Sequence, residues 1–217
     1  MPQHLQIDFV SDVVCPWCAV GLYGLEEALR RTADIVDAEI AFQPFELNPA
    51  MGPEGQNIDE HIAEKYGSNT QQLAESRQML RTRAAGVDFA INQSSQSRIW
   101  NTFDAHRLLH WARTMSRQRE LKHALLKANF SDNKNVSDLD VLLAAATSAG
   151  LDADQARTVL ESGQYAEDVR EAEQLWLSRG IQGVPGIVIN GKWLISGGQP
   201  PEVFEQALRT IAKGEQS

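Results

Sequence analysis

The sequence predicts an α/β fold in which two strand-containing segments flank a long helical one. Three observations support this prediction. Apolar and polar residues alternate near the N-terminus, apolar residues recur at helical spacing from about residue 57 to 180, and a β-branched run stands near the C-terminus. The predicted order is therefore β-α-β, then a series of helices, then β-β-α.

The first segment contains two strands around one helix. Residues 5–10, LQIDFV, alternate and carry β-branched or aromatic side chains, so we predict a strand. Residues 19–32 have leucines on one helical face, although two glycines weaken the pattern. A second alternating run, residues 35–43, predicts the second strand. The three prolines and two glycines of residues 44–57 then predict a long loop.

The middle segment has the start and stop signals of several helices. Thr70 is an expected N-cap and Gly86 an expected C-terminal stop. Ser137 and Asp140 have the spacing of a capping box, and Asp152 is an expected N-cap for the next helix. The chain shows no internal repeat and no linker that would separate independent domains.

The last segment returns to strands. Residues 186–190, GIVIN, are a β-branched run, and residues 193–197 form a partner strand across a tight turn. Residues 198–214 then predict a helix, with Pro200 and Pro201 near its first turn.

Composition and charge argue against several classes of function. The chain has 217 residues and a net charge of −9. Nucleic-acid binding needs clustered cations, so this acidic balance predicts no nucleic-acid partner. The N-terminal stretch MPQHLQIDFV lacks the basic and apolar regions of a secretory signal, and no run of about 18 apolar residues predicts a membrane span. We therefore expect a cytoplasmic protein with no membrane partner.

The chain has two cysteines, both in the stretch VVCPWC at residues 13–18. Two thiols at this spacing can form half of a metal site, pack by chance, or exchange electrons with a disulfide. A structural zinc needs four ligands, so His106 and His110 would have to join Cys15 and Cys18. We expect no metal, because no second cysteine pair exists. Chance packing is less favoured than redox chemistry, because the intervening proline and tryptophan and the following helix form a specific setting.

The redox hypothesis has a physical basis in the predicted helix. Cys15 would stand at its N-terminus, where Pro16 fits because a first-turn residue needs no N–H partner. Unpaired N–H groups and the positive end of the helix dipole stabilise a thiolate there. Cys15 is then the nucleophile, and Cys18, one turn further and less exposed, resolves the mixed disulfide.

A distant stretch supports the redox hypothesis. Residues 183–186 read GVPG and directly precede the β-branched run. Taken together, SDVVCPWC, FQPFELNP and GVPGIVING resemble the DsbA-like thioredoxin-fold family, across about residues 5 to 210. The chain is most similar to the FrnE-like branch of dithiol–disulfide oxidoreductases, which NTFDAHRL at residues 101–108 also resembles.

The resemblance implies a thioredoxin-like fold with a large inserted all-helical domain. Residues 1–50 and 180–217 would form the two halves of the thioredoxin-like domain, with a linking helix at about residues 165–179. Residues 57–164 would form the inserted helical domain. The insertion would account for the long separation between the two motifs.

The resemblance also implies that the Val184–Pro185 peptide bond is cis. Only about 5–6% of X-Pro bonds in folded proteins are cis, so the residues alone predict a trans bond. With a cis bond, Pro185 would lie against the cysteine sulfurs. The Val184 backbone would then pair with an extended substrate chain.

Further residues have roles implied by the resemblance. Asp8 is similar in position to a buried acid that relays a proton to the resolving cysteine, with a solvent-facing strand position as the alternative. Trp17, beside Pro16, would line a substrate groove or would be half-buried surface. Asn48 lies in the loop where glutathione-using relatives contact their ligand. Gly186 departs from the aromatic or hydroxyl residue that relatives often place after the cis-proline, which would leave more room beside the sulfurs.

The residues and the resemblance together predict a thiol–disulfide oxidoreductase. Its substrates would be protein or small-molecule disulfides, which it would reduce or isomerise. We expect no cofactor, with glutathione a candidate co-substrate and glutathione or thioredoxin a candidate reductant. His106 is expected to be a helix-surface or buried, hydrogen-bonded histidine rather than a catalytic one.

Two other hypotheses remain at this point. The scaffold also resembles the 2-hydroxychromene-2-carboxylate isomerases and kappa-class glutathione transferases, so a glutathione-dependent isomerase or transferase is the alternative. Those enzymes typically place a serine where this chain has Cys15, which favours the oxidoreductase. In the third hypothesis the protein is a chaperone or binding module whose thiols are incidental.

Overall fold

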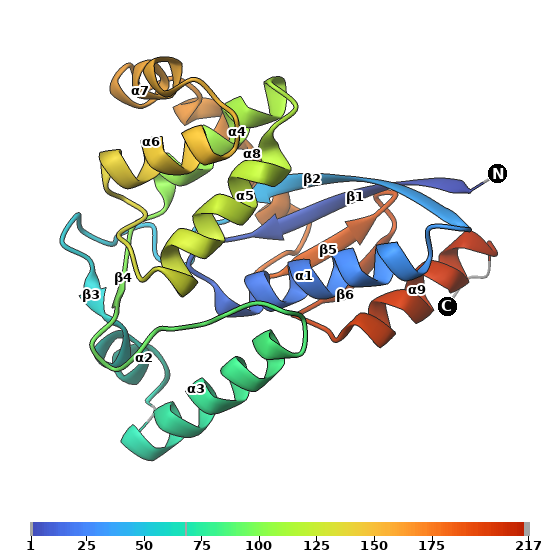
Figure 1. Cartoon of the computed structure of the whole chain (residues 1–217), viewed down its shortest axis with the longest axis horizontal. Coiled ribbons are helices and arrows are strands. Elements are labelled where there is room, and N and C mark those ends of the chain that lie inside the picture. The colour runs from blue at the N-terminus through green and yellow to red at the C-terminus, as the bar shows by residue number, and fades with distance from the viewer. Residues whose placement is uncertain (1, 68, 215–217) are drawn as a thin grey trace.

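A four-stranded sheet forms the centre of the molecule in the computed structural model, which describes residues 2–67 and 69–214 (Figure 1). Its strands are β1 (Gln3–Ser11), β2 (Val36–Pro44), β5 (Gly186–Ile189) and β6 (Trp193–Ser196). They lie in the order β2-β1-β5-β6. β1 and β2 are parallel, whereas β5 is antiparallel to both β1 and β6. This arrangement confirms the predicted thioredoxin-like α/β fold.

Two helices cover one face of the sheet. They are α1 (Pro16–Arg31), which connects the parallel strands, and α9 (Pro201–Ala212). The two helices lie side by side (Figure 1). A large apolar cluster joins them to alternate residues of β1, namely Leu5, Ile7 and Phe9. The strand period of two therefore assigns these residues to the α1 face.

A third helix, α8 (Ala166–Ser178), packs against the other face. Its Trp176 forms an apolar cluster with Val10 of β1, and Val188 of β5 packs against that cluster. Because consecutive strand residues point to opposite faces, Val10 faces α8 while its neighbour Phe9 faces α1. The sheet is thus buried on both sides.

Glycine lets α1 approach the segment before α9 closely. A Cβ on Gly21 would stand 3.1 Å from the Cα of Gly198 and 3.3 Å from the ring of Pro185. Gly198 is tighter still, because a Cβ there would stand 2.5 Å from the carbonyl oxygen of Trp17. Gly21 therefore lowers helix propensity but permits the contact that holds the start of α1 against the loop of Pro185.

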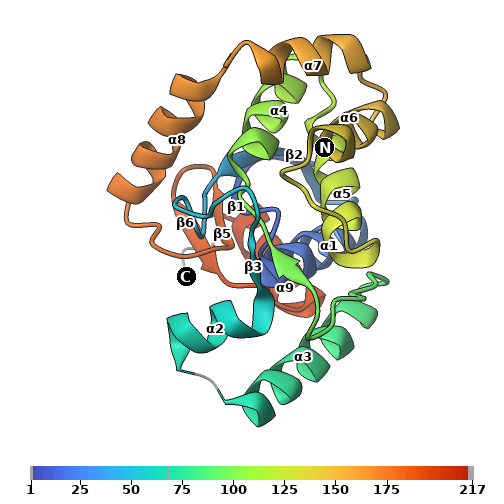
Figure 2. The same cartoon turned by 90° about the vertical axis from the view of Figure 1, so that its left-hand side faces the viewer.

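The helices between β2 and β5 form two groups, one at the top and one at the bottom of both views (Figures 1 and 2). The top group packs around an apolar cluster of its own, into which Val13 and Val14 insert just before the cysteines. This group comprises α4 (Phe103–Thr114), α5 (Gln118–Leu126), a π-helical turn (Lys127–Ser131), α6 (Leu139–Ser148) and α7 (Ala153–Glu161). The bottom group comprises α2 (Ile58–Tyr66), α3 (Thr70–Ala85) and the paired short strands β3 (Gln56–Asn57) and β4 (Arg98–Ile99).

A glutamine of α5 ties the top group to the edge of the sheet. The Gln118 side chain accepts a hydrogen bond from the Phe42 N–H at 3.0 Å and donates one to the Phe42 carbonyl at 2.9 Å. Phe42 belongs to β2, an edge strand whose outer backbone groups need partners when buried. The Gln118 amide thus satisfies the backbone groups that a neighbouring strand would otherwise pair with, and it fixes where α5 lies on the sheet.

Two helix N-caps differ from the prediction by one residue. α3 begins after Asn69 rather than Thr70, because Asn69 forms a complete capping box. α6 begins after Asp138 rather than Ser137, because the Asp138 carboxylate accepts from two backbone N–H groups. Asp152 caps α7, as predicted.

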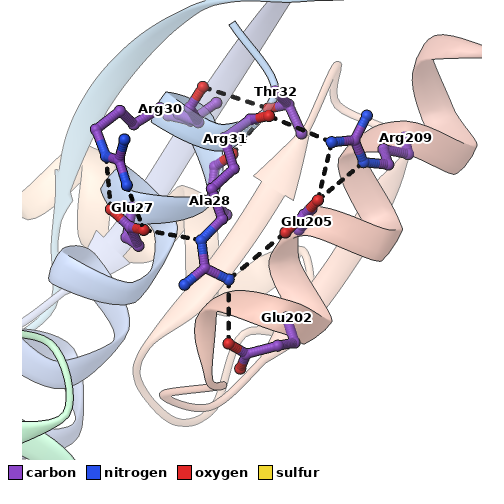
Figure 3. Close-up of polar contacts among 9 residues, drawn as sticks. Glu27, Ala28, Arg30, Arg31, Thr32, Glu202, Glu205 and Arg209 are labelled. Atoms are coloured by element: carbon purple, nitrogen blue, oxygen red, sulfur yellow. Dashed lines mark hydrogen bonds and ion pairs between the residues drawn. The ribbon is translucent and has the colours of Figure 1, made fainter.

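Charged side chains join the exposed edges of α1 and α9 (Figure 3). Glu27 accepts hydrogen bonds of 2.7–2.8 Å from Arg30 and Arg31. Arg31 reaches across to Glu202 at 3.1 Å, and Arg209 donates to the Arg31 carbonyl at 3.2 Å. We call these five residues the α1–α9 charge network. The hydrogen bond from Arg30, followed by that from Arg31, lowers the pKa of Glu27 to about 2.

Candidate active site

Cys15 stands at the N-terminus of α1. It is the N-cap of the helix, and Pro16 is the first helical residue. The Cys15 carbonyl accepts backbone hydrogen bonds from Cys18 at 3.0 Å and from Ala19 at 3.3 Å, so the first turn begins at the cysteine itself. The Cys15 sulfur therefore lies at the end of the helix that carries unpaired N–H groups and the positive end of the dipole. Cys15 is 5% exposed, and Cys18 is fully buried.

The loop of Val184 and Pro185 faces Cys15. The peptide bond between these two residues is cis, as the family resemblance implies. The Cys15 thiol donates a hydrogen bond of 3.7 Å to the Val184 carbonyl oxygen. Pro185 is buried, and its carbonyl accepts from the Gly197 N–H at 2.8 Å. Two stretches that are 169 residues apart in the sequence thus form one site.

Cys18 lies one turn behind Cys15 and is enclosed on all sides. Burial raises the pKa of its thiol well above the usual value, and the neighbouring Cys15 sulfur raises it further. The positive charge of Lys122 opposes this rise. Because a thiolate is the attacking species in disulfide exchange, a thiol in this position needs assistance to react.

Three ionisable residues meet behind the dithiol, and we call them the buried charge cluster: Asp12, His106 of α4 and Lys122 of α5. Asp12 and Lys122 are 0% exposed and His106 is 2% exposed. His106 Nε2 lies 3.5 Å from Asp12 Oδ1, at the outer limit for a hydrogen bond, and Asp12 Oδ2 accepts from the Leu47 N–H at 2.7 Å. Among the described residues Lys122 Nζ has no hydrogen-bond partner, and it lies 5.8 Å from the centre of the Phe42 ring.

Burial affects the two opposite charges of the cluster differently. Burial alone would raise the pKa of Asp12, but His106 and the hydrogen-bond donors around the carboxylate lower it below its usual value. Burial lowers the pKa of Lys122, and Cys18 and Asp12 only reduce that fall. The partners of Asp12 therefore hold it ionised, whereas the site of Lys122 destabilises its ammonium.

A small cavity, which Cys15 does not line, touches the cluster. Its volume is about 130 Å³, and its lining includes His106, Lys122, Gln118, His110 and Arg113. Arg113 is exposed, so the cavity lies between the cluster and the molecular surface. It has room for water molecules, which gives His106 and Lys122 polar surroundings on that side.

Asp8 does not lie beside the cysteines. Its neighbour Ile7 belongs to the apolar cluster that contains Cys18, and side chains alternate along a strand, so Asp8 points to the opposite face. There its carboxylate accepts a 2.7 Å hydrogen bond from Gln43. The buried acid near the dithiol is Asp12, which follows β1. A difference of one residue in strand register is enough to move a side chain to the other face.

A cavity of about 440 Å³, which we call the Cys15 pocket, opens beside Cys15. A volume of this size suits a small molecule. Besides Cys15, it is lined by four residues that the sequence analysis assigns to substrate contact: Pro16, Trp17, Asn48 and Val184.

Gly186 does not line the Cys15 pocket. It is buried at the start of β5 and lines a shallow depression on the other side of the cis-proline loop, with Leu194. A Cβ on Gly186 would stand 3.1 Å from the side chain of Ile181. The absence of a side chain therefore makes room for Ile181, and not for a ligand beside the sulfurs.

The walls of the Cys15 pocket are mostly apolar. Isoleucines and leucines from both helices of the bottom group and from the chain after α3 supply most of this surface. They include Ile58 and Ile62 of α2, Leu73 and Leu80 of α3, and Ile91 and Ile99.

The cationic side chains of the pocket are engaged within the protein. Arg77 of α3 forms an ion pair with Asp59 of α2. Lys65 donates hydrogen bonds of 3.0 Å to the Leu47 carbonyl and to the Asn48 side chain. Burial, and next the charge of Lys65, lower the pKa of His61, so its ring is neutral near pH 7.

The sequence does not predict that Asp12, His106 and Lys122 lie together. His106 is expected to be a buried or surface histidine, and the structure places it in contact with Asp12. Asp12 stands three residues before Cys15, and Lys122 lies beside the buried Leu121 of α5. An acid next to the dithiol and a lysine beside buried leucines are the signals that could have identified the cluster.

The described part of the chain has neither a metal-binding cluster nor a helix that could span a membrane. Within residues 2–67 and 69–214, no group of three or more His, Cys, Asp or Glu side chains is placed to hold a metal ion. In the same residues, no helix is both long enough and apolar enough to cross a membrane.

Three features are typical of a protein with the thioredoxin-like fold. They are the sheet, the cysteine pair at a helix N-terminus and the cis-proline loop that faces this pair. Residues 6–209 match the DSBA-like thioredoxin domain family, and the chain belongs to this family.

Individual relatives agree with this assignment. A probable DsbA oxidoreductase from Streptomyces coelicolor is 35% identical, with a TM-score of 0.91 over 99% of this chain and 92% of that one. The uncharacterised protein YwbO of Bacillus subtilis is 29% identical over 96% of both chains. The cytosolic disulfide reductase DsbM from Pseudomonas aeruginosa, solved with GSH, is 15% identical, with a TM-score of 0.60 over 96% of this chain and 99% of that one. At that identity the likeness to DsbM shows a shared fold.

Proposed function

We propose that this protein is a cytoplasmic thiol–disulfide oxidoreductase of the FrnE-like branch, which reduces or isomerises disulfides with Cys15 and Cys18. The observation that carries the proposal is the position of the Cys15 sulfur. It lies at the N-terminus of α1, in hydrogen-bond contact with the cis-proline loop, and Cys18 follows one turn behind. Proteins of similar structure include a probable DsbA oxidoreductase, a cytosolic disulfide reductase and a putative protein disulfide isomerase, which supports this general class.

The reaction takes place in two exchange steps. The Cys15 thiolate attacks one sulfur of a disulfide R–S–S–R′, a bond forms between Cys15 and the R sulfur, and R′ leaves as a thiolate that takes a proton from water. The Cys18 thiolate then attacks the Cys15 sulfur, the Cys15–Cys18 disulfide forms, and R leaves as a thiolate. Two electrons pass to the substrate. A low-molecular-weight thiol or a thioredoxin-type dithiol then reduces the cysteine pair again.

Reduction is the favoured direction in the cytoplasm, where the thiol pool keeps a dithiol reduced. DsbM, which shares the fold, is described as a cytosolic disulfide reductase and was solved with GSH. That relative supports a reductase and makes glutathione a candidate reductant. The rival glutathione-dependent isomerase or transferase would not require Cys18, which gives the two functions different predictions.

Trapping of the mixed disulfide tests the proposal. Cys18→Ala is mixed with bis(2-hydroxyethyl) disulfide, and the intact mass is measured after acid quenching. The expected result is a stable adduct of one mercaptoethanol on Cys15. The matched variant Cys15→Ala should form no adduct within the same reaction time. Glutathione turnover that persists in Cys18→Ala, with no disulfide reduction by the parent, would instead favour the isomerase.

A further inference from the structure

We propose that the Cys15 pocket binds the apolar part of a low-molecular-weight disulfide and selects such substrates over glutathione disulfide. This inference rests on the proposed function, because the reacting sulfur of the substrate must lie next to Cys15. It goes further by naming the chemical class of the substrate, an aliphatic or aromatic disulfide.

The first argument is the position of Cys15 in the pocket. The Cys15 residue is 5% exposed and lines a cavity of about 440 Å³. A cavity of this volume can hold a whole small disulfide, whereas it is far smaller than a folded protein that carries a surface disulfide. The group that enters the cavity with the sulfur is then surrounded by the pocket walls.

The second argument is the chemistry of those walls. Leu73 and Leu80 of α3 face the cavity together with isoleucines of α2. Removing apolar surface from water is favourable by about 25 cal/mol per Å². A hydrocarbon substituent on the substrate therefore gains free energy from this pocket, while a charged one loses hydration there.

The third argument is the state of the polar side chains. Glutathione carries two carboxylates and an ammonium, which need partners in a binding site. Arg77 of the pocket is already paired with Asp59, and Lys65 already bonds to Asn48. Asn48 itself, the residue that the family resemblance assigns to glutathione contact, is occupied by that bond. Each of these contacts would have to break before glutathione could use the group.

A substrate series with matched variants tests this proposal. The substrates share one mercaptoethanol half, and the other half is butanethiol, hexanethiol or benzyl mercaptan. The polar references are bis(2-hydroxyethyl) disulfide and glutathione disulfide. The variant Leu80→Asn makes the wall polar at a half-buried residue outside the three apolar clusters. Met79→Asn, at the exposed neighbouring position outside the lining, is the control.

The expected result is a kcat/KM that rises from the butyl to the hexyl and benzyl disulfides and exceeds that for glutathione disulfide. Leu80→Asn lowers kcat/KM for the benzyl disulfide by about tenfold, the effect typical of a small change in a hydrophobic pocket. It lowers kcat/KM for bis(2-hydroxyethyl) disulfide by less than it does for the benzyl disulfide, and Met79→Asn changes neither.

Several results would overturn the proposal. A higher kcat/KM for glutathione disulfide than for the benzyl disulfide would contradict the pocket assignment and leave the oxidoreductase intact. Faster reduction of insulin than of any small disulfide would do the same. Failure to reduce every disulfide in the series would instead contradict the proposed function itself.

A second inference comes from the buried charge cluster. We infer that Lys122 is a positioning residue for Cys18, the thiol that must ionise to resolve the mixed disulfide. Both residues are fully buried, and Lys122 Nζ lies 5.8 Å from the ring of Phe42, which belongs to the same apolar cluster as Cys18. This inference also rests on the proposed function. Lys122 Nζ is fully buried without a hydrogen-bond partner in the described part of the chain, so packing and hydrogen bonding do not explain its charge.

The ionisable groups around Cys18 support this role. Cys15, at the N-terminus of α1, and Lys122 of α5 act on the Cys18 thiol, whereas Asp12, in the turn before α1, acts on it through its backbone. The Asp12 carboxylate interacts instead with His106 of α4 and with the charge of Lys122. Of these, Lys122 supplies the charge that opposes the high pKa of the Cys18 thiol. An attack by Cys18 at neutral pH therefore depends on the ammonium of Lys122.

The rate of the second exchange step tests this inference. The reduced protein is mixed with bis(2-hydroxyethyl) disulfide, and the conversion of the Cys15 adduct to the Cys15–Cys18 disulfide is followed from pH 6 to 10. Lys122→Met is expected to move the midpoint of this profile up by about one pH unit, which is about tenfold slower conversion at pH 7. Formation of the Cys15 adduct reports on the proposed function separately.

Two further variants separate charge from packing. Lys122→Gln keeps a polar end without the charge, and it should shift the midpoint in the same way as Lys122→Met. Lys127→Met removes an exposed lysine just after α5, which pairs with Asp132, and should leave the midpoint unchanged. A wild-type midpoint in both Lys122 variants, or an equal shift in Lys127→Met, would contradict the inference.

Discussion

The α1–α9 charge network and the buried charge cluster differ in their exposure to solvent and in how completely their polar atoms are hydrogen-bonded. The α1–α9 charge network lies at the surface, and each of its arginines and glutamates has a hydrogen-bond partner (Figure 3). The buried charge cluster of Asp12, His106 and Lys122 is almost completely enclosed, and each residue has a polar atom without a hydrogen-bond partner among the described residues.

The difference teaches where to look for function. Exposed ion pairs contribute little to stability, because water and salt screen them. Buried charges are costly, and hydrophobic residues in their place are often neutral or stabilising. The α1–α9 charge network can therefore be explained as a surface feature, whereas the cost of the buried charge cluster fits the role that we infer for it beside the dithiol.

The largest expected effect is the loss of the buried carboxylate. Asp12→Ala should destabilise the protein by about 3–5 kcal/mol, because it leaves Lys122 buried without an opposite charge and the Leu47 N–H without its acceptor. Urea unfolding at pH 7 measures the change. Asp12→Asn, which keeps an oxygen for Leu47, should lose less. An Asp12→Ala loss no greater than that of a surface variant would remove the distinction between the two groups.

The next effect concerns the alkaline limit of stability. The folded-state pKa of the Cys18 thiol is raised, so its contribution is fully present below the unfolded-state pKa of about 9 and is lost as pH rises above it. The difference in stability between the reduced parent and Cys18→Ala should therefore change by up to about 1.4 kcal/mol per pH unit above pH 9. Urea unfolding with a reductant at pH 8, 9 and 10 measures it. Parallel curves would show that Cys18 ionises equally in both states.

A smaller effect, with the opposite sign, is expected for the buried lysine. Burial lowers the pKa of Lys122 despite the nearby Cys18 and Asp12, so its site disfavours the ammonium. Lys122→Met, with a similar shape and no charge, should therefore stabilise the protein slightly, because His106 and the hydrogen-bond donors around the Asp12 carboxylate still hold that carboxylate ionised. Thermal and urea unfolding at pH 7 provide the measurement. A marked loss of stability would mean that Lys122 is needed to hold the fold.

The smallest effect is expected at the surface. Arg31→Gln removes the central arginine of the α1–α9 charge network, and the shift in unfolding midpoint should be close to the error of the measurement. Added salt at 0.5 M should remove what difference remains, because these charges are screened. A large, salt-insensitive loss would show that the network acts as a structural unit.

The order of the elements could be predicted because each element carries its own signal. The alternation of residues 5–10 and 35–43 identifies strands that the structure extends to Gln3–Ser11 and places at Val36–Pro44. Two of the predicted N-caps were wrong by one residue, since neighbours such as Asn69 and Thr70 can both cap a helix. Local signals of this kind fix the type of an element better than its ends.

The buried charge cluster could not be predicted in the same way. Asp12, His106 and Lys122 come from a turn and from two helices, and they meet only because α4 and α5 pack on Val13 and Val14. No periodic pattern in the sequence encodes that packing. The contact between Cys15 and Val184 could be predicted, because each residue lies in a sequence motif that is distinctive by itself.

The 169 residues between Cys15 and Val184 also determine when the site can form in a newly made chain. At about 5–20 residues per second, the ribosome needs about 8–34 s to make that length. During that interval the edge of β1 that β5 will occupy stays unpaired, and contacts between such distant residues are slow to form. The candidate site can therefore be completed only once β5 has been made, after the helices α4 and α5 that carry His106 and Lys122.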